Sequence, residues 1–169
     1  MTVSLLVLHD AASAATVQLA DAVAHGARNV EGATSFLRSI SDVSEADLIS
    51  ADGLILGLTL LGDESPLLTW LGRQGGVGGR PSLGGKAGGM FATGGRVRAA
   101  VGGPMASALR WMLGSGMVVI GLPESDKLGR SGSPYGATAT TRVSVEDLEQ
   151  ARSLGQRVAQ LTVMLNETR

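Results

Sequence analysis

The sequence has 169 residues, of which 44% are hydrophobic, enough for one buried core but too few for two ordinary domains. We therefore expect one domain over residues 1–169. Because 14 basic residues oppose 15 acidic ones, the chain has no strong net charge to attract nucleic acid or anionic lipid, and we expect neither as a partner.

The residue types also exclude several kinds of site. Cysteine is absent from the sequence, which excludes disulfides, thiolate metal sites and a cysteine nucleophile. His9 and His25 have no partners at the spacing of metal ligands, so we predict no metal site. The first residues lack the basic segment of a signal peptide, and no apolar run approaches the ~20 residues that span a bilayer. We therefore expect a cytoplasmic protein without a membrane segment.

Strand-like and helix-like segments alternate along the first half of the chain. Residues 3–8 form a continuous apolar run, typical of a strand buried on both faces of a parallel sheet. Residues 12–30 have apolar side chains at helical spacing, and we expect Gly26 to weaken or end that helix. The elements predicted next are a strand at 34–40, a helical turn capped by Ser44, a strand at 51–58 and a helix at 65–73.

The second half continues this alternation after a glycine-rich loop at 74–89. The predicted elements are a strand at 88–93, a helix at 98–113, a strand at 117–121 and an irregular loop at 122–142. Ser144 and Asp147 have the spacing of a capping box, so the last helix is predicted to begin there. Five strands that alternate with helices predict an α/β, doubly wound parallel sheet.

The turn before the last helix carries a resemblance to a known family. Residues 132–138 (GSPYGAT), followed by the capped helix, resemble the end of WrbA-type flavodoxin-like quinone reductases, and a weaker likeness runs along the whole chain. The resemblance implies a three-layer, flavodoxin-like sheet of five parallel strands in the order 2-1-3-4-5. It also implies FMN as the cofactor, electron transfer from NAD(P)H to a quinone or similar acceptor, and assembly as a homodimer or homotetramer.

Three loops are the candidates for the flavin site. In a doubly wound sheet, ligands bind beyond the carboxyl ends of the strands. The loops after the first, third and fourth strands should therefore converge, and they cover residues 9–16, 58–66 and 92–98.

The first of these loops is the candidate phosphate cradle. Ser13 and Thr16 supply hydroxyls, and Ala14 and Ala15 supply backbone N–H groups at the start of a helix, where the dipole favours an anion. Ala11 and Ala14 stand where the family pattern has a hydroxyl residue and a glycine. Ser13 has an alternative role, because serine commonly caps a helix.

The other two loops are the candidates for contacts to the flavin ring. Thr59 and Leu60 lie where the family has a flavin-contacting turn, although the family's proline is missing here. Leu60 either forms an apolar wall of the site or completes the core or an oligomer contact. Thr93, Gly94 and Gly95 resemble the family's loop after the fourth strand, where glycines let the backbone approach the isoalloxazine ring.

Several aromatic and basic residues have two interpretations each. Tyr135 lies in the turn that adjoins the flavin site in the family, and it either packs under its loop or faces a neighbouring subunit. Arg96 and Arg98 either bind phosphate or belong to a solvated helix start. Trp70 and Trp111 lie on predicted helices, so we expect both to pack in the core or in an interface.

Two functions remain open from the sequence. The first is an FMN-binding oxidoreductase of the WrbA-like kind. The second is a cofactor-free binding or regulatory module on the same fold, because alanines replace phosphate-binding residues and the loops are short.

Overall fold

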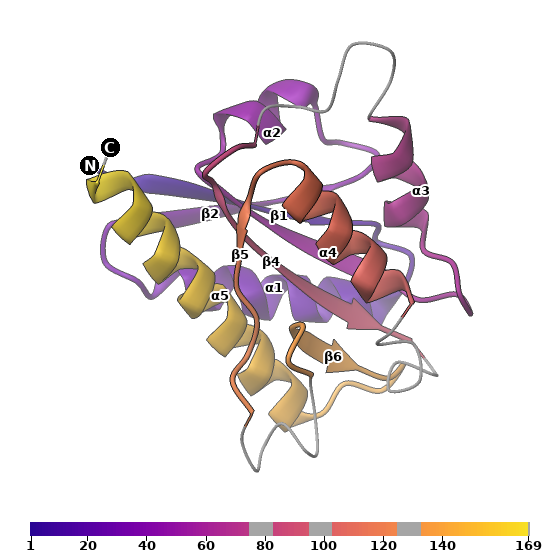
Figure 1. Ribbon diagram of the computed structural model, residues 1–169. Coiled ribbons are helices and arrows are strands. Elements are labelled where there is room, and N and C mark those ends of the chain that lie inside the picture. The colour runs from indigo at the N-terminus through magenta and orange to yellow at the C-terminus, as the bar shows by residue number, and fades with distance from the viewer. Residues whose placement is uncertain (75–82, 95–102, 125–132, 169) are drawn as a thin grey trace.

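Parallel strands form the middle layer of the molecule. The structure, a computed structural model, describes residues 1–74, 83–94, 103–124 and 133–168. The strand order is β2-β1-β3-β4-β5, which confirms the predicted order (Figure 1). The long strands are β1 (Val3–His9), β2 (Ala33–Ser39), β3 (Gly53–Thr59) and β4 (Ala87–Thr93).

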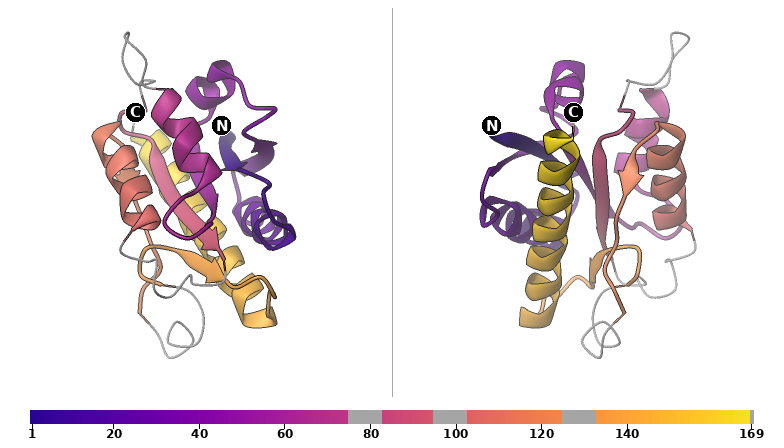
Figure 2. Two further views of the ribbon diagram at one scale, coloured as in Figure 1. Left: turned by 90° about the vertical axis from the view of Figure 1, so that its right-hand side faces the viewer. Right: turned by 60° about the vertical axis from the view of Figure 1, so that its left-hand side comes forward.

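Helices cover both faces of the sheet and complete the three predicted layers (Figure 2). One face is covered by α1 (Ala14–Arg28) and α5 (Val145–Glu167). The opposite face is covered by α2 (Glu45–Ser50), α3 (Pro66–Arg73) and α4 (Pro104–Gly114). The predicted start of α4 at residue 98 and most of the loop at 74–89 lie outside the described residues. Every helix in the described ranges is too short or too polar to cross a lipid bilayer.

The first strand shows why its sequence is a continuous apolar run. Val3, Leu5 and Val7 pack toward α1 and α5, whereas Leu6 and Leu8 pack toward the helices on the other face. All five side chains are buried. A strand that is covered on both faces needs apolar residues at odd and even positions alike.

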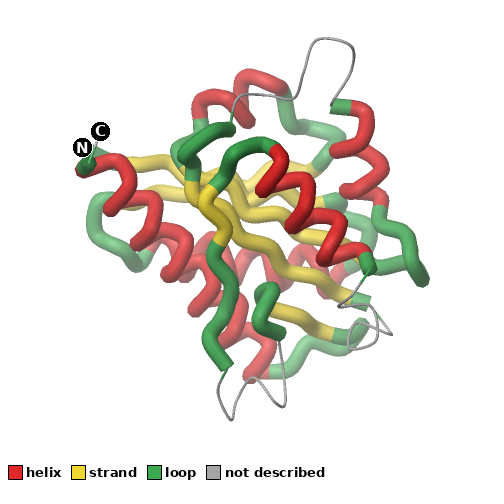
Figure 3. Tube along the Cα trace, in the orientation of Figure 1, coloured by secondary structure: helices red, strands yellow, loops and turns green. Residues whose placement is uncertain are grey.

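The fifth strand differs from the prediction. β5 (Val118–Val119) pairs with the start of β4, and β6 (Ala137–Ala139) pairs in parallel with its end (Figure 3). The strand predicted at 117–121 is therefore too long, and the loop predicted at 122–142 contains a strand. The chain leaves the sheet before Pro123, which has no N–H group for a sheet neighbour.

The turn that returns the chain to the sheet contains the motif singled out in the sequence. The amides of Ser133 and Gly136 each donate to the other residue's carbonyl oxygen, both at 3.0 Å. A side chain at Gly136 would collide with the carbonyl oxygen of Met90 in β4, so this position requires glycine. Tyr135 is half-buried and packs against the hydrophobic core on the α2, α3 and α4 face of the sheet, while a contact with a neighbouring subunit stays a prediction.

Gly26 does not end α1, which continues through it to Arg28. Gly26 instead lies where α1 crosses α5. A Cβ atom there would overlap the carbonyl oxygen of Arg152, and a Cβ atom at Gly155 would overlap the carbonyl oxygen of Val23. The two glycines let the helix backbones touch, so Gly26 has a packing role that its poor helix propensity conceals.

Candidate functional site

The three predicted loops meet at the carboxyl edge of the sheet. Thr59 and Thr93 end neighbouring strands and lie side by side in the β3–β4 register. Thr16, in the first turn of α1, reaches both of them, with an Oγ1–Oγ1 distance of 2.6 Å in each case. All three threonines are buried. The predicted site residues of the three loops therefore come together through one buried hydroxyl cluster.

Ser13 joins this cluster and also caps α1. Its Oγ accepts a hydrogen bond from the amide of Thr16 at 3.1 Å, which confirms the alternative role as a helix cap. The same oxygen lies 2.9 Å from Thr16 Oγ1 and 3.3 Å from Thr93 Oγ1. Both hydroxyls predicted to face a phosphate are therefore engaged with protein atoms.

Asp10 is the member of this site that the sequence analysis missed. Its side chain is only 8% exposed and accepts from the amide and the hydroxyl of Thr59, at 2.8 and 2.5 Å. It also accepts from the amide of Ala12 at 3.1 Å and, more weakly, from the hydroxyl of Ser65 at 3.5 Å. An acidic residue directly after a buried apolar strand was the available signal, because a buried carboxylate needs several donors.

The hydrogens in this cluster have a defined direction. A carboxylate only accepts, and each hydroxyl has one hydrogen to donate. Thr59 gives its hydrogen to Asp10, so Thr16 must donate to Thr59, and Thr93 must donate to Thr16. The hydroxyl hydrogens of these three threonines therefore point inward, toward the carboxylate of Asp10, whereas the half-buried Ser13 hydroxyl can donate to Thr16 Oγ1 or away from the cluster.

The direction of these hydroxyl hydrogens determines how well the loop at the start of α1 can bind the phosphate of FMN. A phosphate is an acceptor and is bound by donors, yet the hydroxyl hydrogen of Thr16 is directed into the protein. The amide of Thr16 is taken by Ser13, which leaves the amides of Ala14 and Ala15 in the first turn of α1. The side chains of this loop therefore fit a phosphate dianion poorly, because Ser13 is the one hydroxyl among them that can still donate to it.

The remaining predicted site residues have structural partners. Leu60 is buried in the core, and its amide donates to the carbonyl oxygen of Thr93 at 2.7 Å. Its neighbour Leu61 is 59% exposed. The amide of Gly94 donates to the carbonyl oxygen of Ala139 at 3.0 Å, which joins the end of β4 to β6. Gly95, like Arg96 and Arg98, lies outside the described residues.

The two tryptophans lie in the helix layer. Trp111 is buried in the core between the sheet and the helices of one face, and Trp70 packs against the same core. This confirms the expectation that both rings have a packing role.

His9, the last residue of β1, is a second buried polar residue at this edge. Its side chain is 7% exposed, and its Nδ1 atom has no hydrogen-bond partner among the described residues. Burial lowers the pKa of His9 below its ordinary value, and the carboxylates of Asp10, Asp21 and Asp42 oppose that shift. His9 is therefore held in its neutral form by the fold.

We expect this burial to make stability depend on pH. The unfolded chain binds a proton at His9 near pH 6.5, whereas the folded chain does so only at lower pH. The contribution of neutral His9 is therefore complete above pH 6.5 and is lost as the pH falls below it, by at most about 1.4 kcal/mol per pH unit. Urea unfolding of the parent and of His9→Phe between neutral and mildly acidic pH measures this slope.

The variant should show a shallower loss of stability in acid than the parent. His25→Gln, at the other histidine of the chain and exposed on α1, is the matched control for the loss of one histidine. Equal slopes in His9→Phe and the parent would contradict this account.

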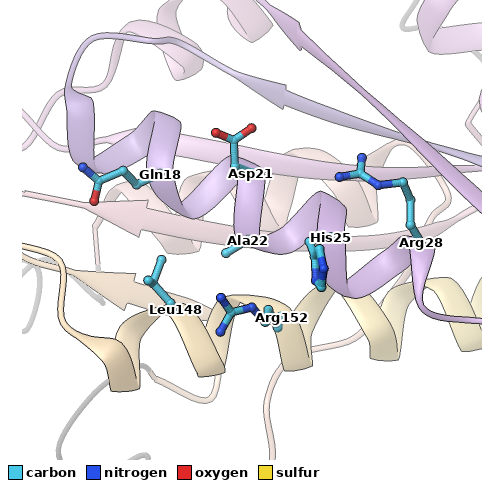
Figure 4. Close-up of a pocket in the computed structure, with 7 residues that line it drawn as sticks. All are labelled: Gln18, Asp21, Ala22, His25, Arg28, Leu148 and Arg152. Atoms are coloured by element: carbon cyan, nitrogen blue, oxygen red, sulfur yellow. The ribbon is translucent and has the colours of Figure 1, made fainter.

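A separate groove lies between α1 and α5, with a volume of about 540 Å³ (Figure 4). It mixes basic, acidic and apolar side chains, and the carboxylate of Asp21 is directed away from α5 (Figure 4). The lining residues are Gln18, Asp21, Ala22, His25, Arg28, Leu148 and Arg152. They include none of the residues predicted for the flavin, so this groove is distinct from the hydroxyl cluster at the strand ends.

The described residues contain no group of three or more His, Asp or Glu side chains arranged to hold a metal ion.

Comparisons with known proteins relate the chain to flavin-linked proteins. No protein-family model matches it. It is 29% identical to an NAD(P)H dehydrogenase (quinone) of Geobacter sulfurreducens, over 88% of this chain and 92% of that protein. It is 35% identical to an NAD(P)H dehydrogenase (quinone) of Archaeoglobus fulgidus, over 49% of this chain and 44% of that protein.

Solved structures agree with this relationship at the level of the fold. The flavodoxin, WrbA-like protein from Agrobacterium tumefaciens has a TM-score of 0.71 at 22% identity, with 97% of this chain and 99% of that chain covered. The chain therefore has the fold of WrbA-like flavodoxins. Oxidised Flavodoxin 1 from Bacillus cereus has a TM-score of 0.70 at 20% identity, over 93% of this chain and 97% of that one.

The alignment with the Geobacter relative also bears on the loop lengths of this chain. It has 188 positions, more than the 169 residues of this chain. The relative therefore has residues that this chain lacks within the matched region, in line with the short loops seen in the sequence.

Proposed function

We propose that this WrbA-like chain is a flavin-dependent oxidoreductase that transfers electrons from NAD(P)H to a quinone or a similar acceptor. The observation that carries the proposal is the meeting of Thr16, Thr59 and Thr93 at the carboxyl edge of the sheet. This edge is where doubly wound sheets bind their ligands. The names of the Geobacter and Archaeoglobus relatives support the choice of reductant and acceptor.

A specific observation favours a second candidate, the cofactor-free binding or regulatory module. The hydroxyls of Ser13, Thr16, Thr59 and Thr93 all have partners within the protein, and buried Asp10 has donors for both of its oxygens. The polar cluster is therefore satisfied without a ligand. A protein that had lost its flavin would have this property.

The two candidates differ in a measurable way. Titration of the purified protein into FMN and, separately, into riboflavin should change the flavin fluorescence in a saturable manner with at least one of them. The flavin-loaded protein should then oxidise NAD(P)H faster when a soluble quinone is added than when it is omitted. No saturable change with either flavin up to about 100 µM, a weak limit for a cofactor site, would reject the oxidoreductase and favour the module. The expected homodimer or homotetramer stays a prediction.

A further inference from the structure

We propose that this site prefers a flavin without a terminal phosphate, such as riboflavin, over FMN, and that Asp10 is the residue that sets this preference. The inference rests on the proposed flavin-dependent function and specifies its cofactor. It is based on the poor chemical complementarity between the loop at the start of α1 and the phosphate of FMN.

Asp10 places a negative charge beside the phosphate loop. Its side chain is buried, and its four hydrogen bonds come from neutral donors of Ala12, Thr59 and Ser65. In the described part of the chain, no lysine or arginine forms an ion pair with this carboxylate. A phosphate dianion in the same loop would lie near this like charge. A neutral ribityl chain would meet no such repulsion.

The second step is the loss of backbone donors. Asp10 Oδ1 accepts from the amide of Ala12, which turns that N–H group toward the carboxylate. The turn places Ala11 between them at a φ of 54°, in the left-handed region that alanine rarely adopts. The loop therefore adopts a conformation that binds the Asp10 carboxylate. The amide of Ala12 is no longer available to bind an external anion.

The third step is the direction of the hydroxyl hydrogens. When Ser13 donates to Thr16 Oγ1, the site that remains free on Ser13 Oγ is a lone pair, while the amides of Ala14 and Ala15 remain donors. An alcohol can donate to the lone pair and accept from an amide at once. A phosphate can only accept. The loop is therefore complementary to the terminal hydroxyl of riboflavin and poorly complementary to the phosphate of FMN.

The test is the ratio of the dissociation constants for FMN and riboflavin, measured by flavin fluorescence on the parent and on Asp10→Asn. We expect the parent to bind riboflavin more tightly by about tenfold or more, the scale of one unfavourable charged contact. Asp10→Asn removes the charge and frees the hydroxyl hydrogens, so the ratio should move toward FMN by at least about tenfold.

Asp52→Asn is the matched control. Asp52 also accepts from a backbone amide and a hydroxyl, those of Ser4, at 2.8 and 3.2 Å. It lies at the opposite, amino edge of the sheet, next to the start of β3. The variant changes the net charge equally, so its FMN-to-riboflavin ratio should equal that of the parent.

A second variant keeps the proposal testable if Asp10→Asn does not fold. Thr59→Val retains the carboxylate but removes the hydroxyl that links Asp10 to Thr16. It should shift the ratio toward FMN, by less than the removal of the charge does.

The outcomes separate this inference from the function on which it rests. Tighter binding of FMN than of riboflavin by the parent would overturn the role of Asp10 and leave the flavin-dependent function intact. An equal ratio in the parent and in both site variants would overturn it as well. Failure of the parent to bind either flavin would reject the flavin-dependent function itself, and this inference with it.

Discussion

Gly155→Ala should destabilise the protein by about 3 kcal/mol, the upper part of the range for overpacked cores. Gly155 lies in the middle of α5, where its backbone meets the backbone of α1. An added Cβ atom would overlap the carbonyl oxygen of Val23, which belongs to a helix and cannot turn away as a flexible side chain can. The two helices would have to separate, and the apolar contacts between them and the sheet would weaken.

Equilibrium unfolding in urea measures this loss. Gly72→Ala is the matched control, because Gly72 is also helical, in α3, but has open space where its Cβ atom would lie. There the substitution should stabilise the protein by up to about 1 kcal/mol, through helix propensity alone. If both variants became more stable, the close contact between α1 and α5 would not exist in solution.

The strands and the last helix could be predicted from the sequence because their signals are local. The apolar run at 3–8 corresponds to β1, and the capping box at Ser144 and Asp147 is present at the start of α5. There, the amide of Ser144 donates to the Asp147 carboxylate at 2.9 Å, and the amide of Asp147 donates to Ser144 Oγ at 3.1 Å. Such patterns are satisfied within a few residues, so they do not depend on the rest of the fold.

Features that depend on distant contacts could not be predicted in this way. Gly26 was misjudged because helix propensity describes one chain segment, whereas its role depends on α5, more than a hundred residues later in the sequence. The fifth strand was misjudged for a related reason. Its second half, β6, has three residues, which is too short a run to be distinguished from a loop by periodicity.

In the candidate site, too, some features could be predicted from the sequence and others depended on distant contacts. The position of its loops followed from the strand order, which is a property of the whole fold, and Thr16, Thr59 and Thr93 do meet there. Asp10 was missed because its effect depends on the direction of its side chain beyond the end of β1 and on the distance to Thr59. A sequence gives neither the direction of a hydroxyl hydrogen nor the acceptor that sets it.

Thr16→Val should destabilise the protein by about 2 kcal/mol, because it removes the central hydroxyl of the cluster while preserving the shape of the side chain. Thr16 is 0% exposed, so water cannot replace the lost partner. Thr59 would lose the hydrogen that it accepts, and Thr93 would lose the acceptor for its own. The variant should unfold at lower urea concentration than the parent, with an unchanged dependence on urea.

Thr162→Val provides the comparison that isolates the cluster. Thr162 is equally buried, but its hydroxyl donates to the carbonyl oxygen of Val158, one turn earlier in α5, at 2.7 Å. That carbonyl oxygen also accepts a backbone hydrogen bond within the helix, so removing the hydroxyl should lower the free energy of unfolding by less than about 1 kcal/mol. A similar, small loss in both variants would mean that the hydroxyls of the three loops are not coupled. A large loss at Thr16 alone would mean that the polar cluster stabilises the fold without a ligand.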